Sequence, residues 1–239
     1  MNASCLARAL LWRAVLTLTG GLRVRGTAML PAGPCVLVAN HSSHADTAAL
    51  IAALPASRRP AVAAAADYWF RGGPRSRICQ ALCGAFPVRR SGGGSADLAA
   101  AACLLAAGRD VIVFPEGTRS RDGTIGEFHH GAARLAAAAG VPLVPAGITG
   151  TRTLLPPGGP TGSAGSAVRL RRAAVTVSFG VPLDGSAFNG SACGGSAFGD
   201  TAFGGTAFGG TACGDTAMAG GMGGVMAVAR ARVAELVRP

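Results

Sequence analysis

The chain has 239 residues and a mass of 23.5 kDa, which suits one domain with at most a small appendage. Hydrophobic residues make up 49% of it and aromatic residues only 5%, and its 22 cationic side chains, all arginine, exceed its 11 acidic ones. The net charge of +11 favours a polyanionic partner, and because nothing resembles a nucleic-acid-binding module and stacking aromatics are scarce, we expect an anionic membrane surface and no nucleic acid.

The first predicted element is a helix over residues 5–19, an apolar segment interrupted by Arg8 and Arg13. No uninterrupted apolar run reaches the ~18–20 residues that a membrane-spanning helix needs. Trp12 and the two arginines fit a helix that lies in the membrane interface, and a helix docked on the domain is the alternative. The interfacial interpretation predicts a peripheral or monotopic protein at the cytoplasmic face of the cell membrane.

Short apolar runs then alternate with helical segments. In chain order we predict a strand at 35–39, a helix at 46–54, a strand or other buried segment at 61–66, and helices at 74–84 and 96–107. A strand at 111–114, a helix at 131–139, and strands at 141–149 and 173–179 follow. Pro55, Gly84, Gly108 and Gly140 mark four helix ends. The alternation predicts an α/β fold with a mainly parallel central sheet flanked by helices, preceded by an N-terminal amphipathic helix.

A tandem repeat separates the last strand from a final predicted helix at 225–237. From Ser186 seven five-residue units read SAFNG, SACGG, SAFGD, TAFGG, TAFGG, TACGD and TAMAG. A pentapeptide-type solenoid coil is one interpretation, but glycine costs backbone entropy in any fixed structure, which favours a low-complexity insertion. The expected organisation is therefore an N-terminal helix (1–24), a main domain (25–184), a Gly-rich insertion (185–224) and a C-terminal helix of the main domain (225–239).

Residues 40–46, NHSSHAD, place a possible acid–base pair directly after the strand at 35–39. His41 and Asp46 are five residues apart where a strand passes into a helix, so the turn can fold them together. Imidazole, with a reference pKa near ~6.5, can take a proton from an alcohol, and a carboxylate on its other ring nitrogen fixes the tautomer. In open α/β sheets this strand end is where ligands bind. The alternative for His41 is a histidine bonded to the backbone at a helix start.

Residues 114–120, FPEGTRS, place a carboxylate, a glycine and an arginine on a turn after the strand at 111–114. The guanidinium of Arg119 is a planar, bidentate donor that suits a phosphomonoester, and Gly117 lets the main chain approach a ligand closely. A salt-bridged turn carboxylate is one interpretation of Glu116.

The strings NHSSHAD and FPEGTRS, in this order and about seventy residues apart, resemble the first and third signature blocks of the glycerolipid acyltransferases of the 1-acyl-sn-glycerol-3-phosphate (lysophosphatidate) acyltransferase type. Residues 84–89, GAFPVR, resemble the second block and residues 141–145, VPLVP, the fourth. The resemblance covers roughly residues 25–183 and implies a glycerolipid acyltransferase-like fold.

The resemblance also implies roles for single residues. It makes His41 the catalytic base and Asp46 its partner. It also implies that Glu116 orients Arg119 or meets the glycerol hydroxyls of the acceptor. The residues implied in binding the acceptor are Arg89, Glu116, Gly117, Thr118 and Arg119, and those linked to the acyl donor or chain are Val141, Pro142 and Pro145. No metal and no resident cofactor is implied, because acyl-CoA or acyl-carrier protein enters as a co-substrate.

The implied activity is that of a membrane-associated O-acyltransferase. It would move a fatty acyl group to the sn-2 hydroxyl of 1-acyl-glycerol-3-phosphate and form phosphatidic acid for phospholipid biosynthesis. The alternatives are a different acceptor (a lyso-ornithine lipid, another lysophospholipid or a mannosylated lipid) or a non-catalytic membrane-binding scaffold. The expected partners are the lysophospholipid, the acyl donor and an anionic membrane surface, and the sequence indicates no particular oligomeric state.

Overall fold

The computed structural model describes residues 3–89, 94–156, 171–184 and 221–238, and the pentapeptide repeat lies outside these ranges. Its strands are β1 (Leu22–Arg25), β2 (Val36–Ala39), β3 (Ala61–Ala65), β4 (Ala85–Val88), β5 (Val111–Val113), β6 (Leu143–Thr149) and β7 (Val175–Phe179). Its α-helices are α1 (Ala3–Leu18), α2 (Ala45–Ala53), α3 (Ala66–Trp69), α4 (Pro74–Cys83), α5 (Gly94–Ala106), α6 (Gly131–Ala139), α7 (Thr151–Leu154) and α8 (Met222–Leu236).

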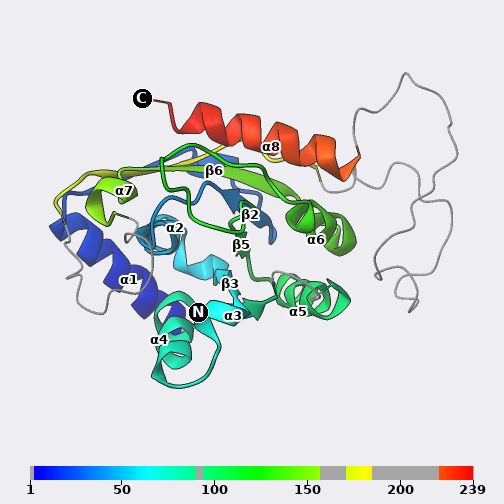
Figure 1. The fold of residues 1–239 in the computed structure, drawn as a ribbon, viewed down its shortest axis with the longest axis horizontal. Helices are drawn as coiled ribbons and strands as arrows, with labels where there is room; N and C mark the ends of the chain where they lie inside the picture. The colour runs from blue at the N-terminus through cyan, green and yellow to red at the C-terminus, as the bar shows by residue number, and fades with distance from the viewer. Residues whose placement is uncertain (1–2, 90–93, 157–170, 185–220, 239) are drawn as a thin grey trace, which may run out of the picture.

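Within these ranges the strands form one sheet in the order β1-β7-β6-β2-β5-β3-β4 (Figure 1). Neighbouring strands are parallel, except that β6 and β7 are antiparallel. The structure thus confirms the predicted mainly parallel sheet flanked by helices. Because β2 and β5 are parallel neighbours, whatever follows one strand lies beside whatever follows the other.

Helices cover both faces of the sheet. The core on one face joins Leu37 and Ala39 of β2 to side chains of α1, α2 and α7, and the core on the other face joins Val36 and Val38 to side chains of α5, α6 and α8. Figure 1 shows α8 lying along β6. All four residues of β2 are buried, as expected for a central strand whose two faces are both covered.

The predicted helix ends are confirmed where glycine or proline marks them. Gly84 and Gly140 follow α4 and α6 with φ of 63° and 61°, the left-handed conformation that glycine adopts at little cost. The last turn of α6 continues into Val141, whose N–H donates to the carbonyl of Ala136 at 3.0 Å. As a result β6 begins at Leu143, two residues later than the prediction.

The two edge strands, β1 and β4, were not predicted. Half of the residues of β1 are arginines, and β4 contains Pro87, which removes a donor from the ladder and is tolerated in an edge strand. Leu22 of β1 pairs with Val175 of β7, so the expected boundary between residues 24 and 25 falls inside a strand of the sheet.

The N-terminal helix α1 is docked on the domain by one side. Leu16 is fully buried, the Trp12 indole N–H donates to the carbonyl of Leu82 at 2.8 Å, and the Arg13 guanidinium donates to the carbonyl of Ala52 at 2.7 Å. The other side exposes three leucines, Leu10, Leu11 and Leu18. No helix in the described part of the chain is both long enough and apolar enough to cross a bilayer.

A buried ion pair fastens the N-terminal ends of β2 and β5. Asp110, which is 1% exposed, precedes β5 and accepts hydrogen bonds from the Arg58 guanidinium and from the main-chain N–H of Cys35, the residue before β2. Arg58 also donates to the carbonyl of Pro31 at 2.6 Å. Burial raises the pKa of the Cys35 thiol above its usual range, which keeps the thiol protonated. The pair holds the two central strands together at the end opposite to His41.

Candidate active site

The two sequence motifs meet at the C-terminal edge of the sheet. Val38 of β2 pairs with Val113 of β5, so the residues that follow these two strands lie next to each other. His41 leaves the end of β2, and the 114–120 turn leaves the end of β5. The parallel pairing therefore brings together two segments that are about seventy residues apart in the sequence.

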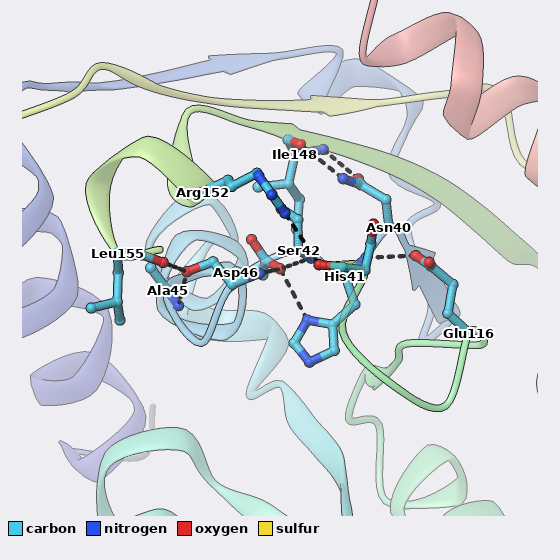
Figure 2. Close-up of polar contacts among 11 residues, drawn as sticks. Asn40, His41, Ser42, Ala45, Asp46, Glu116, Ile148, Arg152 and Leu155 are labelled. Carbon is cyan, nitrogen blue, oxygen red and sulfur yellow. Dashed lines mark hydrogen bonds and ion pairs between the residues drawn. The ribbon is translucent and has the colours of Figure 1, made fainter. Parts of the chain in front are cut away.

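Asn40 lets the chain leave the sheet at His41. Its side-chain amide donates to the carbonyl of Ile148 at 2.9 Å, and its side-chain oxygen accepts from the Ile148 N–H at 2.8 Å (Figure 2). The side chain thus takes the place of the next main-chain pairing between β2 and β6. The main chain of His41 is released from the ladder while the strand end stays fixed.

His41 and Asp46 form the predicted pair. The Nδ1 atom of His41 lies 2.9 Å from the Oδ2 atom of Asp46, and the same oxygen accepts from the main-chain N–H groups of Ser42 (2.7 Å) and Ser43 (2.8 Å). The Asp46 side chain is fully buried, whereas the His41 side chain is 17% exposed. A carboxylate at Nδ1 selects the tautomer that carries its proton there, which leaves Nε2 free to accept one.

The plane of the His41 ring is set by Phe114. The two ring centroids are 4.1 Å apart with an interplanar angle of 20°, a stacked arrangement. Phe114 itself packs against the core that contains α2. The first residue of the second motif therefore supports the ring of the first motif, a contact that the sequence reading did not predict.

The carboxylate of Glu116 binds main-chain amides. Its Oε1 atom accepts from the N–H of His41 at 2.7 Å (Figure 2). Its Oε2 atom accepts from the N–H of Gly126 at 3.0 Å. Within the described residues these are its hydrogen-bond partners, and the expected contact with Arg119 is not among them. Glu116 thus ties the strand end at His41 to the loop that follows the second motif.

The 116–119 turn presents main chain and a cation beside the pair. Gly117 has a φ of +69° and is exposed, as is Thr118. The N–H of Ser120 donates to the carbonyl of His41 at 2.8 Å, which places the residue after Arg119 against His41. Within the ranges that the structure describes, the Arg119 guanidinium forms no hydrogen bond or ion pair, so it is available to an anionic ligand.

A compact turn continues the loop beyond Arg119. Asp122 Oδ1 accepts from the side-chain hydroxyl (2.7 Å) and the main-chain N–H (2.9 Å) of Thr124 and from the hydroxyl of Ser120 (3.0 Å). These hydrogen bonds, led by the one from the Thr124 hydroxyl, lower the pKa of Asp122 from 3.8 to about 2. The carboxylate form therefore orders this turn at neutral pH.

Arg89 lies on the same edge of the sheet but farther away. It follows β4, which is separated from β2 by β5 and β3, or three strand spacings of about 14 Å in total. Its guanidinium lies 3.3 Å from the carboxylate of Asp97 in α5 and is half exposed. The structure thus directs Arg89 toward α5 rather than toward the His41–Asp46 pair.

Of the three predicted residues of the fourth motif, Pro145 lies within β6, whereas Val141 and Pro142 precede that strand. Pro145 pairs with Val38 in the middle of β2, and Pro142 accepts at its carbonyl from the N–H of Val36 at 3.0 Å. Val141 lies before β6, about 20 Å along the strand direction from the His41 end. The structure does not bring these three residues to His41, and their contacts are those of core strand positions.

The positioning contacts of Asn40, Phe114 and Arg152 were missed by the sequence reading. Arg152, in α7, donates to the carbonyls of Ser120 and Arg121. No spacing rule links α7 to the second motif, so only the folded chain shows this contact. Within the described ranges, no group of three or more His, Cys, Asp or Glu side chains is arranged to hold a metal ion.

The fold and this site define the class of protein. A family model described as Acyltransferase matches residues 21–149, which run from just before β1 to the end of β6 and contain both motifs. The match covers more than half of the chain, and the chain therefore belongs to the acyltransferase family.

Several curated relatives share parts of the sequence. A chloroplastic 1-acyl-sn-glycerol-3-phosphate acyltransferase of Brassica napus is 32% identical over 143 residues, which is 56% of this chain and 39% of the relative. A chloroplastic 1-acyl-sn-glycerol-3-phosphate acyltransferase of Arabidopsis thaliana is 43% identical over 83 residues, which is 35% of this chain and 21% of that one. The chain thus spans about two fifths, or less, of the length of these relatives.

A solved structure shares the fold. The crystal structure of the 1-acyl-sn-glycerophosphate (LPA) acyltransferase PlsC from Thermotoga maritima superposes with a TM-score of 0.62 at 24% sequence identity. The similarity covers 77% of this chain and 70% of that one. It supports the arrangement of sheet and helices described above.

Proposed function

We propose that the protein transfers a fatty acyl group from an acyl thioester, acyl-CoA or acyl-carrier protein, to the sn-2 hydroxyl of 1-acyl-glycerol-3-phosphate, with phosphatidic acid as the product. The observation that carries this proposal is the His41–Asp46 pair, whose partly exposed imidazole lies beside the arginine-bearing turn. The acyltransferase family of the chain and the names of its relatives are consistent with the reaction.

In this reaction the acceptor alcohol is the nucleophile. Nε2 of His41 takes the proton of the hydroxyl while the hydroxyl oxygen attacks the thioester carbon. Asp46 stabilises the imidazolium that forms, because its oxygen already accepts the Nδ1 proton at 2.9 Å. When the tetrahedral intermediate collapses, the carbon–sulfur bond breaks and the imidazolium returns the proton to the departing sulfur. A positioned base contributes about 10²–10⁴-fold to the rate of such a step.

The acceptor phosphate is the proposed ligand of Arg119. A phosphomonoester carries about −1.5 to −2 charge at neutral pH, and a guanidinium without an internal carboxylate partner can bind it through two parallel hydrogen bonds. Gly117 and Thr118 expose main chain and hydroxyl on the same turn. Arg89 would join this site only after it leaves Asp97, so Asp97→Asn should lower the acceptor KM if Arg89 takes part.

The test is acyl transfer from labelled oleoyl-CoA to 1-acyl-glycerol-3-phosphate by wild type, His41→Ala and His44→Ala. His44 is the matched control because it lies in the same motif but stacks on Tyr68 instead of pairing with Asp46. Activity in the wild type and the control, with loss in a folded His41→Ala variant, supports the proposal. Competition with other lysolipids then identifies the acceptor. A wild type that is inactive with all acceptors and both donor carriers would favour the scaffold alternative.

We also propose peripheral association with an anionic membrane surface, at the cytoplasmic face of the cell membrane, through α1. Leu10, Leu11 and Leu18 are 56%, 44% and 74% exposed, while the opposite side of the helix is docked. Deleting α1 would remove the buried Leu16 and uncover the core that it packs against, so a gentler change is needed. Replacing the three exposed leucines with glutamine should reduce flotation with anionic liposomes, and unchanged flotation of a folded variant would exclude α1 as the contact.

A further inference from the structure

The loop that follows the second motif, residues 120–126, is held at both ends by arginines from outside the motifs. We propose that Arg152 of α7 and Arg230 of α8 are positioning residues that hold this loop, and through it Arg119 and the main chain of His41, in the geometry for acyl transfer. Neither arginine lies within the residues matched by the family model. The catalytic part of this inference rests on the proposed function, and the structural part stands independently of it.

Arg152 holds the first end of the loop. Its Nη1 atom donates to the carbonyl of Ser120 at 3.3 Å, and its Nη2 atom donates to the carbonyl of Arg121. Two successive carbonyls thus accept from one guanidinium, an arrangement that its planar fork allows and a single ammonium does not reproduce equally well.

Arg230 holds the second end in the same way. Its Nη2 atom donates to the carbonyl of Ile125 at 2.9 Å, and its Nε atom donates to the carbonyl of Gly126 at 2.8 Å. Both ends of the loop therefore depend on charge-assisted hydrogen bonds from helices that follow β6 in the chain.

One end of the loop is hydrogen-bonded to His41 directly, and the other end is connected to it through Glu116. The N–H of Ser120 donates to the carbonyl of His41 at 2.8 Å. At the other end, the N–H of Gly126 donates to Glu116, whose second oxygen accepts from the N–H of His41 at 2.7 Å. The peptide groups that Arg152 and Arg230 fix thus lie one or two hydrogen bonds from the catalytic residue.

Packing alone does not fasten the loop to α8. An open groove of about 440 Å³ lies between Thr124 and Ile125 of the loop and the small residues Ala227, Ala231 and Ala234 of the helix. Residues 121–124 are exposed. Arg230 lines this groove, and its removal takes away the two hydrogen bonds from α8 to the second end of the loop, where Ile125 keeps only its apolar packing against the core that contains α8.

The structural test is hydrogen exchange measured by mass spectrometry on the intact protein, in peptides that cover residues 117–128. Arg230→Ala is compared with Arg232→Ala, the same substitution two residues along α8. Arg232 donates to the carbonyl of Val181 and does not touch the loop. We expect exchange in the loop peptides to become about tenfold faster, or more, in Arg230→Ala and to stay unchanged in Arg232→Ala. Equal exchange in the two variants would overturn the proposal.

The catalytic test uses the same variants and Arg152→Ala in the acyl-transfer assay. We expect the acceptor KM to rise roughly 3–10-fold in Arg152→Ala and Arg230→Ala with a smaller loss in kcat, because Arg119 is displaced while the His41–Asp46 pair stays intact. Arg230→Lys should bring the acceptor KM part of the way back to the wild-type value. It also provides a second variant if Arg230→Ala fails to fold. Faster exchange without a change in KM would refute the catalytic part. An inactive wild type would count against the proposed function and leave the exchange result standing.

Discussion

Replacing Asp46 with asparagine tests the role of the catalytic pair most directly. One oxygen of Asp46 accepts three hydrogen bonds, from the His41 ring and from the main-chain N–H groups of Ser42 and Ser43, within 2.7–2.9 Å. The asparagine oxygen can keep the two main-chain donors and so preserve the turn. It cannot supply the negative charge that stabilises an imidazolium.

The expected loss in kcat is about 10²–10⁴-fold, the range that a positioned base contributes, with the acceptor KM changed by less than about threefold. The substitution should also destabilise the fold. The second carboxylate oxygen, Oδ1, is buried and has no hydrogen-bond partner within the described residues, so the new amide N–H₂ group lacks an acceptor there. That costs about 1–3 kcal/mol in the free energy of unfolding.

The assay is steady-state acyl transfer at several acceptor concentrations, combined with chemical denaturation of the same preparation. If the Asp46→Asn protein is folded and keeps kcat within tenfold of the wild type, the assignment of this carboxylate to catalysis is refuted. A large rise in KM with little change in kcat would instead mean that Asp46 only shapes the acceptor site.

Three further changes probe other parts of the structure. Phe114→Leu keeps apolar bulk but removes the stacked ring, so kcat should fall roughly 3–10-fold at unchanged Tm, and wild-type kcat would contradict the role of the ring. Asp110→Ala leaves the Arg58 cation, whose side chain is 12% exposed, without its carboxylate partner, so chemical denaturation should show a loss of about 1–3 kcal/mol; a loss below about 0.5 kcal/mol would contradict the predicted contribution of the ion pair. The pKa of Asp122 lies below its unfolded value of 3.8, so its hydrogen bonds stabilise the loop above that pH and are lost as the pH falls through about 2. Carboxyl NMR should give a midpoint near 2 that moves toward 3.8 in Thr124→Val, and a wild-type midpoint near 3.8 would show that the turn is not formed.

Much of the fold could be predicted from local patterns. The central strands are uninterrupted apolar runs because both of their faces are covered, and the helix ends at Gly84 and Gly140 follow from the left-handed conformation that glycine adopts there. The edge strands β1 and β4 escaped prediction because one is half arginine and the other contains a proline. Their strand conformation comes from pairing with β7 and β3, which no short window of sequence contains.

For the site, the sequence by itself determined the reacting pair, because His41 and Asp46 lie on one turn and their contact needs only five residues of chain. Only the tertiary structure decided the contacts between residues of separate segments. It gave Glu116 two main-chain amides as partners, placed Phe114 against the His41 ring, and directed Arg89 toward α5. The physical reason is that such contacts depend on which strands become neighbours in the sheet. That choice is made by the burial of whole faces, and a motif records only the residues within its own few positions.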